Sequence, residues 1–410
     1  MSDVIEVDVA IMGAGPVGGT LACLLARQGV RVAAIDRAAL PPLEHPDVDG
    51  RAYAIAAGSK RVMEDAGLWQ ALPIAPGPIT EIRVTDGKVG RPASKLFLHF
   101  DSAEAGEDLA GEAFGWMIEA RSLRMAINRA LDAAENLHVF APAEAEIRRT
   151  DEHAEISIKG GPQGDTTLRA ALVIAAEGRQ SPLRQQAGIR VTRLPYNQTG
   201  MVGMMAHEKP HHGSALEHFL PAGPFAQLPM AGLEGEPNVS AFVWPERDDM
   251  AARMMALPEE AFGRELRRRM GNHLGEVRIL GRRWSYPLSL MHAERYYDTR
   301  LALAGDAAHG MHPIAGQGLN VGFRDVGALG RIIPEALAAG EDIGGQDLLR
   351  RYQAERRPDT LMMLTATDVL DRLFSNDNPL LRLARDVGIA AVHRMPRLKR
   401  MFMRQAMGVS

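Results

Sequence analysis

The stretch from Val4 to Asp36 constrains the fold more than any other part of the chain. It contains two short apolar runs on either side of a segment of helical composition. The first run leads directly into the motif Gly13-x-Gly15-x-x-Gly18, and the second run ends at Asp36. This order predicts a strand, a glycine turn, a helix and a second strand with an acidic residue at its tip.

The spacing of this unit fits an ADP-containing dinucleotide. Glycine lets the turn form and lets the backbone approach a diphosphate, which the positive end of the following helix attracts. Asp36 follows Gly15 by about twenty residues, where an adenosine ribose presents its hydroxyl groups. The carboxylate of Asp36 would repel a 2′-phosphate, so FAD or NAD is favoured over NADP. The alternative is a glycine-rich turn in an ordinary βαβ unit.

Length and composition narrow the class of protein. The chain has 410 residues, enough for two or three domains, with 46% hydrophobic and 24% charged residues. A net charge of −4 gives no reason to expect nucleic acid as a partner. Cys23 is the single cysteine, which excludes an intrachain disulfide and a cysteine-based zinc cluster. The sequence has no apolar run long enough to span a membrane, so we expect a cytoplasmic protein with at most peripheral contact at the inner face of a membrane.

A second candidate site lies between Leu301 and Asn320. A short apolar strand runs into Gly305-Asp306, which places the carboxylate of Asp306 at a strand tip. Gly316 and Gly318 then open a helix whose first N–H groups are free to meet an electron-rich group. Taken alone, Asp306 is more often a helix cap or an ion-pair partner. In combination with the first glycine turn, a ligand-binding role is favoured.

The motifs occur in the order found in a known family. Besides Gly13-x-Gly15-x-x-Gly18 they are Glu177-Gly178-x-x-Ser181-x-x-Arg184, Gly305-Asp306-Ala307-Ala308-His309, Pro313 and Gly316-Gln317-Gly318-x-Asn320. The chain resembles the class A flavin monooxygenases, which have the para-hydroxybenzoate hydroxylase fold. More narrowly, residues 51–55 and the stretch from residue 373 to the end are similar to the ubiquinone-biosynthesis hydroxylases.

The resemblance implies an α/β fold with a discontinuous, Rossmann-like FAD-binding domain. That domain would comprise residues 1–75, 105–185 and 285–350. Residues 76–104 and 186–284 would form a β-sheet substrate domain, and residues 351–410 a C-terminal helical segment.

The resemblance also implies roles for individual residues. Gly13, Gly15 and Gly18 would hold the FAD diphosphate, and Asp36 the adenosine ribose, with Arg37 beside it. Arg51 and Arg121 would contact the cofactor, and Asp306 would bind near the ribityl–diphosphate junction. The edge of the isoalloxazine would meet Pro313, Gly316, Gly318, Leu319 and Asn320. Pro313 and the adjacent His312 are the candidate catalytic residues.

One motif departs from the family pattern. Glu177 stands where the family has Asp before the glycine, and this segment is linked in the family to both flavin and NADPH. A second glycine turn for a nicotinamide cofactor is not visible in the sequence. We therefore expect NAD(P)H to bind transiently as the electron donor, or a redox partner to supply the electrons.

The implied function is an FAD-dependent monooxygenase that hydroxylates the ring of a polyprenyl phenol in ubiquinone biosynthesis with O₂. Methionines gather in residues 201–255, which fits a prenylated substrate but also fits plain core packing. The alternatives are an FAD oxidoreductase that acts on an isoprenoid without oxygen, and a non-catalytic subunit of a biosynthetic complex. The ring carbon, the tail length, the electron donor and the oligomeric state stay open.

Two further features have weaker implications. His309 and His312 are three residues apart without a nearby carboxylate pair, so we expect no metal site. From residue 379 to the end, seven basic residues stand against one acidic residue and alternate with apolar ones. Such a segment fits an anionic membrane surface or a partner in a biosynthetic complex, and equally a packed helix with a solvated basic face.

Overall fold

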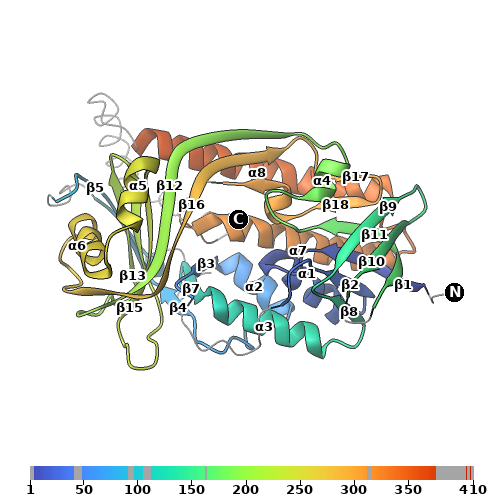
Figure 1. Cartoon of the computed structure of the whole chain (residues 1–410), viewed down its shortest axis with the longest axis horizontal. Coiled ribbons are helices and arrows are strands. Elements are labelled where there is room, and N and C mark those ends of the chain that lie inside the picture. The colour runs from blue at the N-terminus through green and yellow to red at the C-terminus, as the bar shows by residue number, and fades with distance from the viewer. Residues whose placement is uncertain are drawn as a thin grey trace.

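The computed structural model describes residues 4–40, 49–90, 97–104, 112–161, 164–311 and 316–374, together with Met403 and Met407. The described elements form three sheets flanked by helices (Figure 1). The first sheet contains β1 (Ile5–Met12), β2 (Val32–Ile35), β8 (Leu137–Phe140), β9 (Glu144–Arg149), β10 (Ala154–Lys159), β11 (Thr166–Ala175), β17 (Tyr297–Asp298) and β18 (Leu301–Leu303). The second contains β5 (Glu81–Asp86), β6 (Phe97–Asp101), β12 (Val191–His207), β13 (Ser214–Leu220), β14 (Gly223–Pro229), β15 (Val239–Arg247), β16 (Val277–Ala293) and β19 (His309–Gly310). The third is small and contains β3 (Ala52–Ala56), β4 (Gly77–Ile79) and β7 (Gly115–Glu119).

The helices lie on and between these sheets. They are α1 (Pro16–Arg27), α2 (Ala57–Asp65), α3 (Ala120–Ala133), α4 (Pro182–Gln186), α5 (Asp248–Met255), α6 (Glu259–Met270), α7 (Gln317–Ala338) and α8 (Gln346–Phe374). The predicted α/β fold class is confirmed. The division into domains stays a prediction.

The first sheet is the dinucleotide-binding half of the molecule. Its centre is parallel, in the order β18-β11-β1-β2-β8. Val9, Ala10 and Ile11 of β1 are all buried, and α1, with α3 and α7 packed beside it, lies against this sheet. A strand buried on both faces reads as a continuous apolar run rather than an alternating one. This accounts for the apolar run before Gly13.

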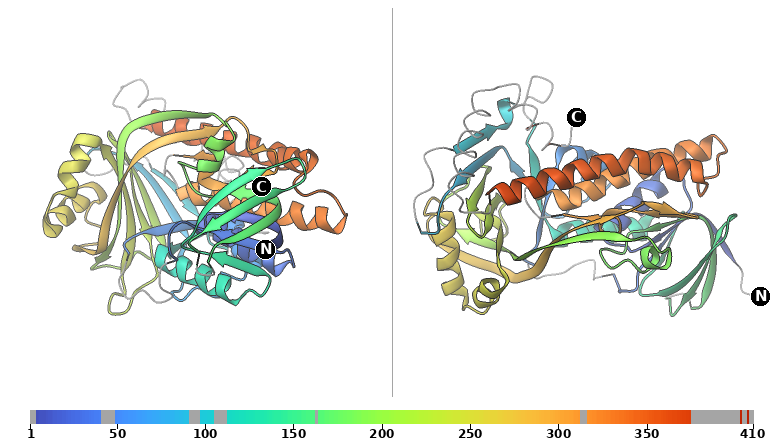
Figure 2. Two further views of the ribbon diagram at one scale, coloured as in Figure 1. Left: turned by 45° about the vertical axis from the view of Figure 1, so that its right-hand side comes forward. Right: turned by 90° about the horizontal axis from the view of Figure 1, so that it is seen from above.

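The second sheet is mainly antiparallel, in the order β19-β16-β12-β15-β14-β13-β5-β6. β12 and β16 are 17 residues each, and they run the length of the molecule and join its two ends (Figures 1 and 2). Their pairing shifts register between Pro195 and Thr199, and again between Val202 and Met204. These irregularities, and the burial of both faces in the second half of β12, explain why the sequence pattern is weak here.

The methionine-rich region contributes mainly to the core. Met201 and Met205 are buried in a cluster with Phe242 and Trp244, on one face of the second sheet. Met204 belongs to a different buried cluster on the other face. The core-packing alternative therefore accounts for these three methionines.

Only two residues of the basic C-terminal segment are described. Met403 and Met407 are buried in the cluster that contains Met204 of the second sheet and Met230, the residue after β14. The remainder of the predicted basic face lies outside the described residues. In the part of the chain that the structure describes, no helix is both long and apolar enough to cross a membrane.

Candidate active site

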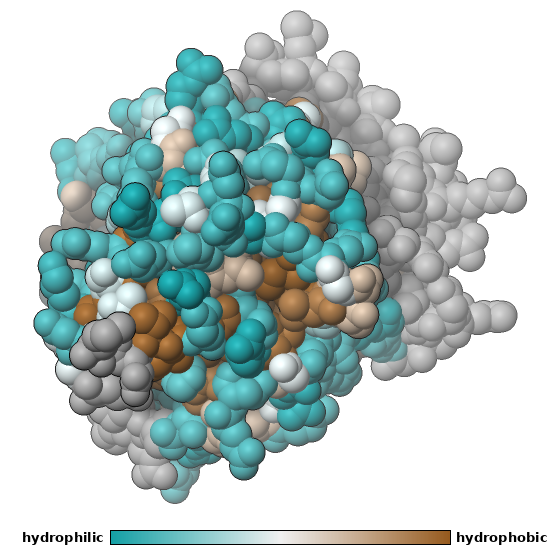
Figure 3. All heavy atoms as spheres, turned by 90° about the vertical axis from the view of Figure 1, so that its right-hand side faces the viewer, coloured by the Kyte–Doolittle hydropathy of each residue, from teal (hydrophilic) through white to brown (hydrophobic). Residues whose placement is uncertain are grey.

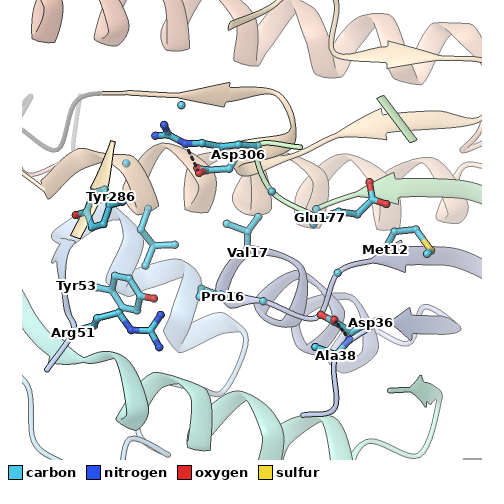
Figure 4. Close-up of a pocket in the computed structure, with 18 of the residues that line it drawn as sticks. Met12, Pro16, Val17, Asp36, Ala38, Arg51, Tyr53, Glu177, Tyr286 and Asp306 are labelled. Atoms are coloured by element: carbon cyan, nitrogen blue, oxygen red, sulfur yellow. Dashed lines mark hydrogen bonds and ion pairs between the residues drawn. The ribbon is translucent and has the colours of Figure 1, made fainter. Parts of the chain in front are cut away.

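A cavity of about 1580 Å³ lies between the glycine turn and the second sheet. Gly13, Gly15 and Asp36 line it from the dinucleotide-binding half, and Val202 and Val243 from the second sheet. Figure 4 shows residues of several elements around this space, Pro16 and Val17 from α1 and Tyr53 from β3 among them. Sites distant in the sequence therefore share one cavity.

Glycine suits the three positions of the turn for different geometric reasons. Gly13 has a φ of 97°, and a Cβ there would lie 2.5 Å from the carbonyl oxygen of Ala176 on the neighbouring segment. A Cβ on Gly18 would lie 1.9 Å from the carbonyl oxygen of Gly13. A Cβ on Gly15 would meet no atom within 4 Å. Gly13 and Gly18 thus permit the turn itself, whereas Gly15 leaves open space where a ligand can approach the backbone.

Two helices begin at the cavity. α1 starts after Gly15 and α7 after Gly316, and both glycines line the cavity. Among the described residues, neither helix has a side-chain cap at its N-terminus or an acidic residue in its first turn. The first N–H groups of a helix attract anions when no side chain satisfies them. The cavity therefore has two sites suited to electron-rich groups.

Asp36 orders the backbone around the turn. Its Oδ2 accepts a hydrogen bond from the N–H of Ala14 (2.8 Å), and its Oδ1 accepts one from the N–H of Ala38 (2.9 Å). The residue also lines the cavity, as does the exposed Arg37. Both residues therefore line the cavity, and their contact with the adenosine ribose stays a prediction.

The two predicted arginines have different surroundings. Arg51 lines the cavity, pairs with Asp49 at 2.6 Å, and stacks over Trp284 with its guanidinium carbon 4.5 Å from the ring centroid. Arg121 pairs with Glu119 at 3.1 Å and is not among the cavity-lining residues in the described part of the chain.

Arg124 instead reaches the glycine turn. Its Nη1 donates to the carbonyl oxygen of Ala14 at 2.6 Å, and burial lowers the pKa of its guanidinium. Sequence reasoning missed this residue. The sequence carries one signal that could have indicated it: Arg124 is three residues from Arg121, so both lie on the same face of the helix.

Asp306 lines the cavity and has a partner that sequence reasoning also missed. The Nε of Arg179 donates to Oδ2 of Asp306 at 3.1 Å, shown by the dashed line in Figure 4. The same guanidinium donates to the backbone oxygen of Ser289 at 3.3 Å. About half of the Asp306 side chain is exposed, so its carboxylate is accessible from the cavity.

The side chain of Asn320 is bound within the protein, and the expected contact of its backbone with the isoalloxazine stays a prediction. Its Oδ1 accepts from the N–H of Ala56 (2.8 Å), and its Nδ2 donates to the oxygens of Ala54 (2.9 Å) and Gly316 (3.0 Å). The residue is only 1% exposed. Because the amide is fully engaged with protein, Asn320 fastens the start of α7 to β3. Gly316, Gly318 and Leu319 do line the cavity.

A buried polar network supports the Gly305–His309 loop from behind. Oδ2 of Asp325 on α7 accepts from the N–H of Gly305 (2.9 Å) and from Nε2 of His309 (2.7 Å). Its Oδ1 accepts from Nε of Arg356 on α8 (2.8 Å). Burial alone would raise the pKa of Asp325, but His309 and Arg356 outweigh it and hold this pKa below its usual value. The network fixes the loop that carries Asp306.

The methylene group that Glu177 has in addition to the family's Asp lets its carboxylate reach a side chain four residues along the chain. Its Oε2 accepts from the hydroxyl of Ser181 at 2.5 Å, and Oγ of Ser181 accepts from the N–H of Arg184 to cap α4. Burial raises the pKa of Glu177, against the opposing effect of the Ser181 hydrogen bond.

The predicted catalytic residues His312 and Pro313 lie outside the described residues. Within the described ranges, no cluster of three or more His, Cys, Asp or Glu side chains could hold a metal ion.

Comparison with known proteins identifies the family. A family model described as an FAD binding domain matches residues 6–367. A ubiquinone hydroxylase, UbiL, of Rhodospirillum rubrum is 48% identical over 402 residues, which cover 98% of this chain and 89% of that protein. This chain belongs to the class A flavin monooxygenases.

Further relatives place this flavin monooxygenase among the ubiquinone-biosynthesis hydroxylases. The 3-demethoxyubiquinol 3-hydroxylase of Escherichia coli is 33% identical over 407 residues, with 98% of each chain covered. The structure of PqsL, a probable FAD-dependent monooxygenase of Pseudomonas aeruginosa, matches with a TM-score of 0.75 at 24% identity, covering 94% of this chain and all of that one. At that identity the structural match supports the fold alone.

The cavity of this flavin monooxygenase fits FAD. The open space at Gly15 and the uncapped start of α1 suit the diphosphate, and Asp36, which lines the same cavity, would meet the ribose. The start of α7 suits negative charge on the ring system. The roles of the individual residues stay predictions.

Proposed function

We propose that this chain hydroxylates the aromatic ring of a polyprenyl phenol in ubiquinone biosynthesis, with FAD as cofactor, O₂ as co-substrate and NAD(P)H as electron donor. The relatives named as ubiquinone hydroxylases support this function. One structural observation carries the proposal: a single cavity joins the dinucleotide-binding turn to an apolar wall of the second sheet. FAD bound there supplies the activation of O₂ and the transfer of one oxygen atom.

The residues of the second sheet are suited to hold an apolar ring and keep water away. Val202, Leu228 and Val243 line the cavity from adjacent strands, and their side chains offer no hydrogen bonds to water. Tyr286 of β16 and Tyr53 of β3 lie near one another at one end of the cavity in Figure 4. Burial raises the pKa of both phenols, so both stay neutral hydrogen-bonding groups at physiological pH.

The decisive experiment follows oxygen into the product. The purified chain, loaded with FAD, is incubated with a short-chain 2-prenylphenol and NADH under ¹⁸O₂, and the product is examined by mass spectrometry. Incorporation of one ¹⁸O atom that depends on FAD supports the proposal. A product formed equally well without O₂ would instead indicate an oxidoreductase that inserts no oxygen.

A non-catalytic role is tested with a variant. Gly15→Ala adds a methyl group where the structure has open space, so the chain should fold while flavin binding weakens. The variant is expressed in a strain that lacks the protein. If that strain makes as much ubiquinone as a strain that carries the parent chain, flavin turnover is dispensable and the chain is a scaffold.

We further propose that the basic C-terminal segment brings the enzyme to an anionic membrane surface, where a prenylated substrate resides. The seven basic residues against one acidic residue support this contact. Flotation with vesicles that contain anionic lipid, compared with neutral vesicles, tests it. Equal recovery with both vesicle types would contradict the proposal.

A further inference from the structure

The wall that the second sheet contributes to the cavity has few side chains that can form hydrogen bonds. Of the cavity-lining residues on β12, β14, β15 and β16, three have a side-chain donor: Trp284, Ser285 and Tyr286. Nε1 of Trp284 donates to the backbone oxygen of Asp49 at 2.8 Å. Ser285 is paired across the sheet with Met201, which is buried in the apolar cluster on the other face. Tyr286 is therefore the residue of these four strands whose side chain can offer a hydrogen bond to a ligand in the cavity.

Strand pairing turns Tyr286 toward the cavity. Tyr286 lies directly opposite Gly200 of β12, and Trp284 lies opposite Val202 in the same register. Residues two apart on a strand point to the same face, and Val202 lines the cavity. A Cβ on Gly200 would lie 3.4 Å from Cε2 of Tyr286, so glycine leaves room for the ring to rest across β12. The ring is thus held against this strand on the cavity side.

The hydroxyl group of Tyr286 is available to a ligand. The residue lines the cavity and is 41% exposed. Within the described residues, no hydrogen bond involves its hydroxyl group. Desolvation by the surrounding protein raises the pKa of the phenol, so it stays protonated and can donate at physiological pH.

The surroundings place Tyr286 near the expected position of the flavin ring. The start of α7, which suits the isoalloxazine, is fastened to β3 because Nδ2 of Asn320 donates to the oxygen of Ala54 at 2.9 Å. Tyr53 is the preceding residue of β3 and lies near Tyr286 in Figure 4. In that view the phenol oxygen of Tyr53 points toward Pro16 of α1, whereas that of Tyr286 points away from Pro16. The hydroxyl of Tyr286 is therefore on the side away from the glycine turn.

The other end of the cavity has a different character. There β9 and β10 contribute four charged residues to the lining, Glu144, Glu146, Arg148 and Glu155. Figure 3 shows this end of the molecule, where hydrophilic side chains predominate around smaller apolar areas. A prenylated phenol carries one oxygen on a large apolar surface. It therefore suits the end of the cavity at the second sheet, where apolar side chains surround one available hydroxyl group.

We propose that the hydroxyl group of Tyr286 donates a hydrogen bond to an oxygen atom on the substrate ring and so orients the ring. This inference rests on the proposed function, because it assumes that a prenylated phenol occupies the cavity. The apolar residues of the second sheet hold the remainder of the ring, and the hydrogen bond fixes which ring carbon faces the flavin. A ring without the oxygen leaves the tyrosine hydroxyl unpaired, which disfavours its binding.

The test compares three ligands in the wild-type enzyme and in Tyr286→Phe. The FAD-loaded enzyme is titrated with a short-chain 2-prenylphenol, its methyl ether and the corresponding prenylbenzene, and binding is followed through the visible spectrum of the flavin. Loss of a hydrogen bond between neutral groups should raise the Kd of the phenol and of the ether about fivefold. The Kd of the prenylbenzene, which has no oxygen, should change less than twofold. Because each ligand is compared with itself, differences in hydrophobicity between ligands cancel.

Two controls separate recognition from a structural role. Tyr297→Phe on β17 removes the same atom at a residue outside the cavity lining in the described part of the chain, and should leave all three Kd values unchanged. Tyr286→Phe keeps the ring that rests on Gly200, so its Kd for FAD should stay within twofold of the wild-type value. Under ¹⁸O₂, the wild-type enzyme should label one ring position and Tyr286→Phe several. A purely structural defect would slow turnover without changing the labelled position.

Three results would overturn the inference. Tyr286→Phe might leave the Kd of the phenol unchanged, it might weaken all three ligands equally, or Tyr53→Phe in its place might be the variant that selectively weakens the phenol and the ether. The methyl ether retains an acceptor oxygen but no donor, so a loss limited to the phenol would also contradict donation by Tyr286. Failure of the proposed function shows separately, as absence of ¹⁸O from the product of the wild-type enzyme, whether or not binding is selective.

Discussion

The buried carboxylate of Asp325 gives the sharpest prediction about stability. Its side chain is fully buried and accepts hydrogen bonds from Gly305, His309 and Arg356 at 2.7 to 2.9 Å. In Asp325→Asn the amide oxygen can still accept, but the charge is lost, and among the described residues the guanidinium of Arg356, 6% exposed, keeps Asp359 alone as a charged partner. Removing one member of a buried ion pair costs about 3–5 kcal/mol.

The cost translates into a measurable shift. At about 2.1 cal/mol/K for each residue, a chain of this length has an unfolding entropy near 0.9 kcal/mol/K. Asp325→Asn should therefore lower the apparent Tm by about 4–6 °C in a thermal scan of the FAD-loaded protein. The control is Glu146→Gln, which removes an ion pair to Lys159 in which both side chains are more than 60% exposed. It should shift Tm by less than 1 °C, because exposed ion pairs contribute about 0–1 kcal/mol.

The sign of the pH dependence follows from the lowered pKa of Asp325. A carboxyl group whose pKa is lower in the folded state contributes stability above its unfolded pKa, and this contribution is lost as the pH falls through the folded pKa. The difference in Tm between wild type and Asp325→Asn should be constant from pH 8 to about pH 5 and shrink below about pH 4. A difference under 1 °C at pH 7, equal to that of the exposed control, would refute the reasoning.

Three further predictions concern the cavity. Gly18→Ala should abolish folding or flavin retention, because its Cβ would lie 1.9 Å from a backbone oxygen, whereas Gly15→Ala should keep the wild-type circular dichroism and raise the Kd for FAD at least tenfold. Asn320→Ala removes three hydrogen bonds and should cost about 2–3 kcal/mol in urea unfolding, with lower flavin occupancy at equal FAD concentration. Arg124→Met, which keeps the length of the side chain but not its donors, should weaken FAD binding more than Arg121→Met does; equal Kd values for the two variants would contradict this.

The elements around the first glycine turn could be predicted from sequence because several local signals agree there. A buried strand, a turn that needs glycine and a helix of good formers leave few alternatives before Asp36. The second sheet could not be predicted in the same way. The second half of β12 is buried on both faces, so residues 200–207 lack the alternation that identifies a strand. Its partner β16 pairs with shifts in register.

The site shows a different limit of sequence reasoning. A motif fixes which residue stands at a position but not where its side chain points. Asn320 belongs to the predicted motif, yet its amide is engaged by β3 and by Gly316. Arg121 and Arg124 are equivalent in helical spacing, and only the packing of α3 against α1 brings Arg124 to the turn. Such contacts between distant segments carry no local signal in the chain.

Glu177 allows a last prediction, because the family residue can be restored there. Glu177→Asp shortens the side chain by one methylene group, about 1.5 Å of bond length, so the 2.5 Å hydrogen bond to Ser181 is lost unless the backbone moves. A hydrogen bond to a charged group contributes about 1.5–3 kcal/mol. Amide hydrogen exchange of α4 should therefore accelerate, while the KM for the nicotinamide donor stays within twofold, since the carboxylate serves α4.

The paired control for this variant is Ser181→Ala, which removes the same hydrogen bond from the other side and should reproduce the faster exchange. If Glu177→Asp changes the KM for NADH tenfold while Ser181→Ala does not, the carboxylate acts on the electron donor directly. The extra methylene group would then be an adaptation of the donor site, and the local role in capping α4 would be secondary. If both variants leave the KM for NADH unchanged and speed up exchange alike, the replacement of the family's Asp by Glu is compensated within α4 itself.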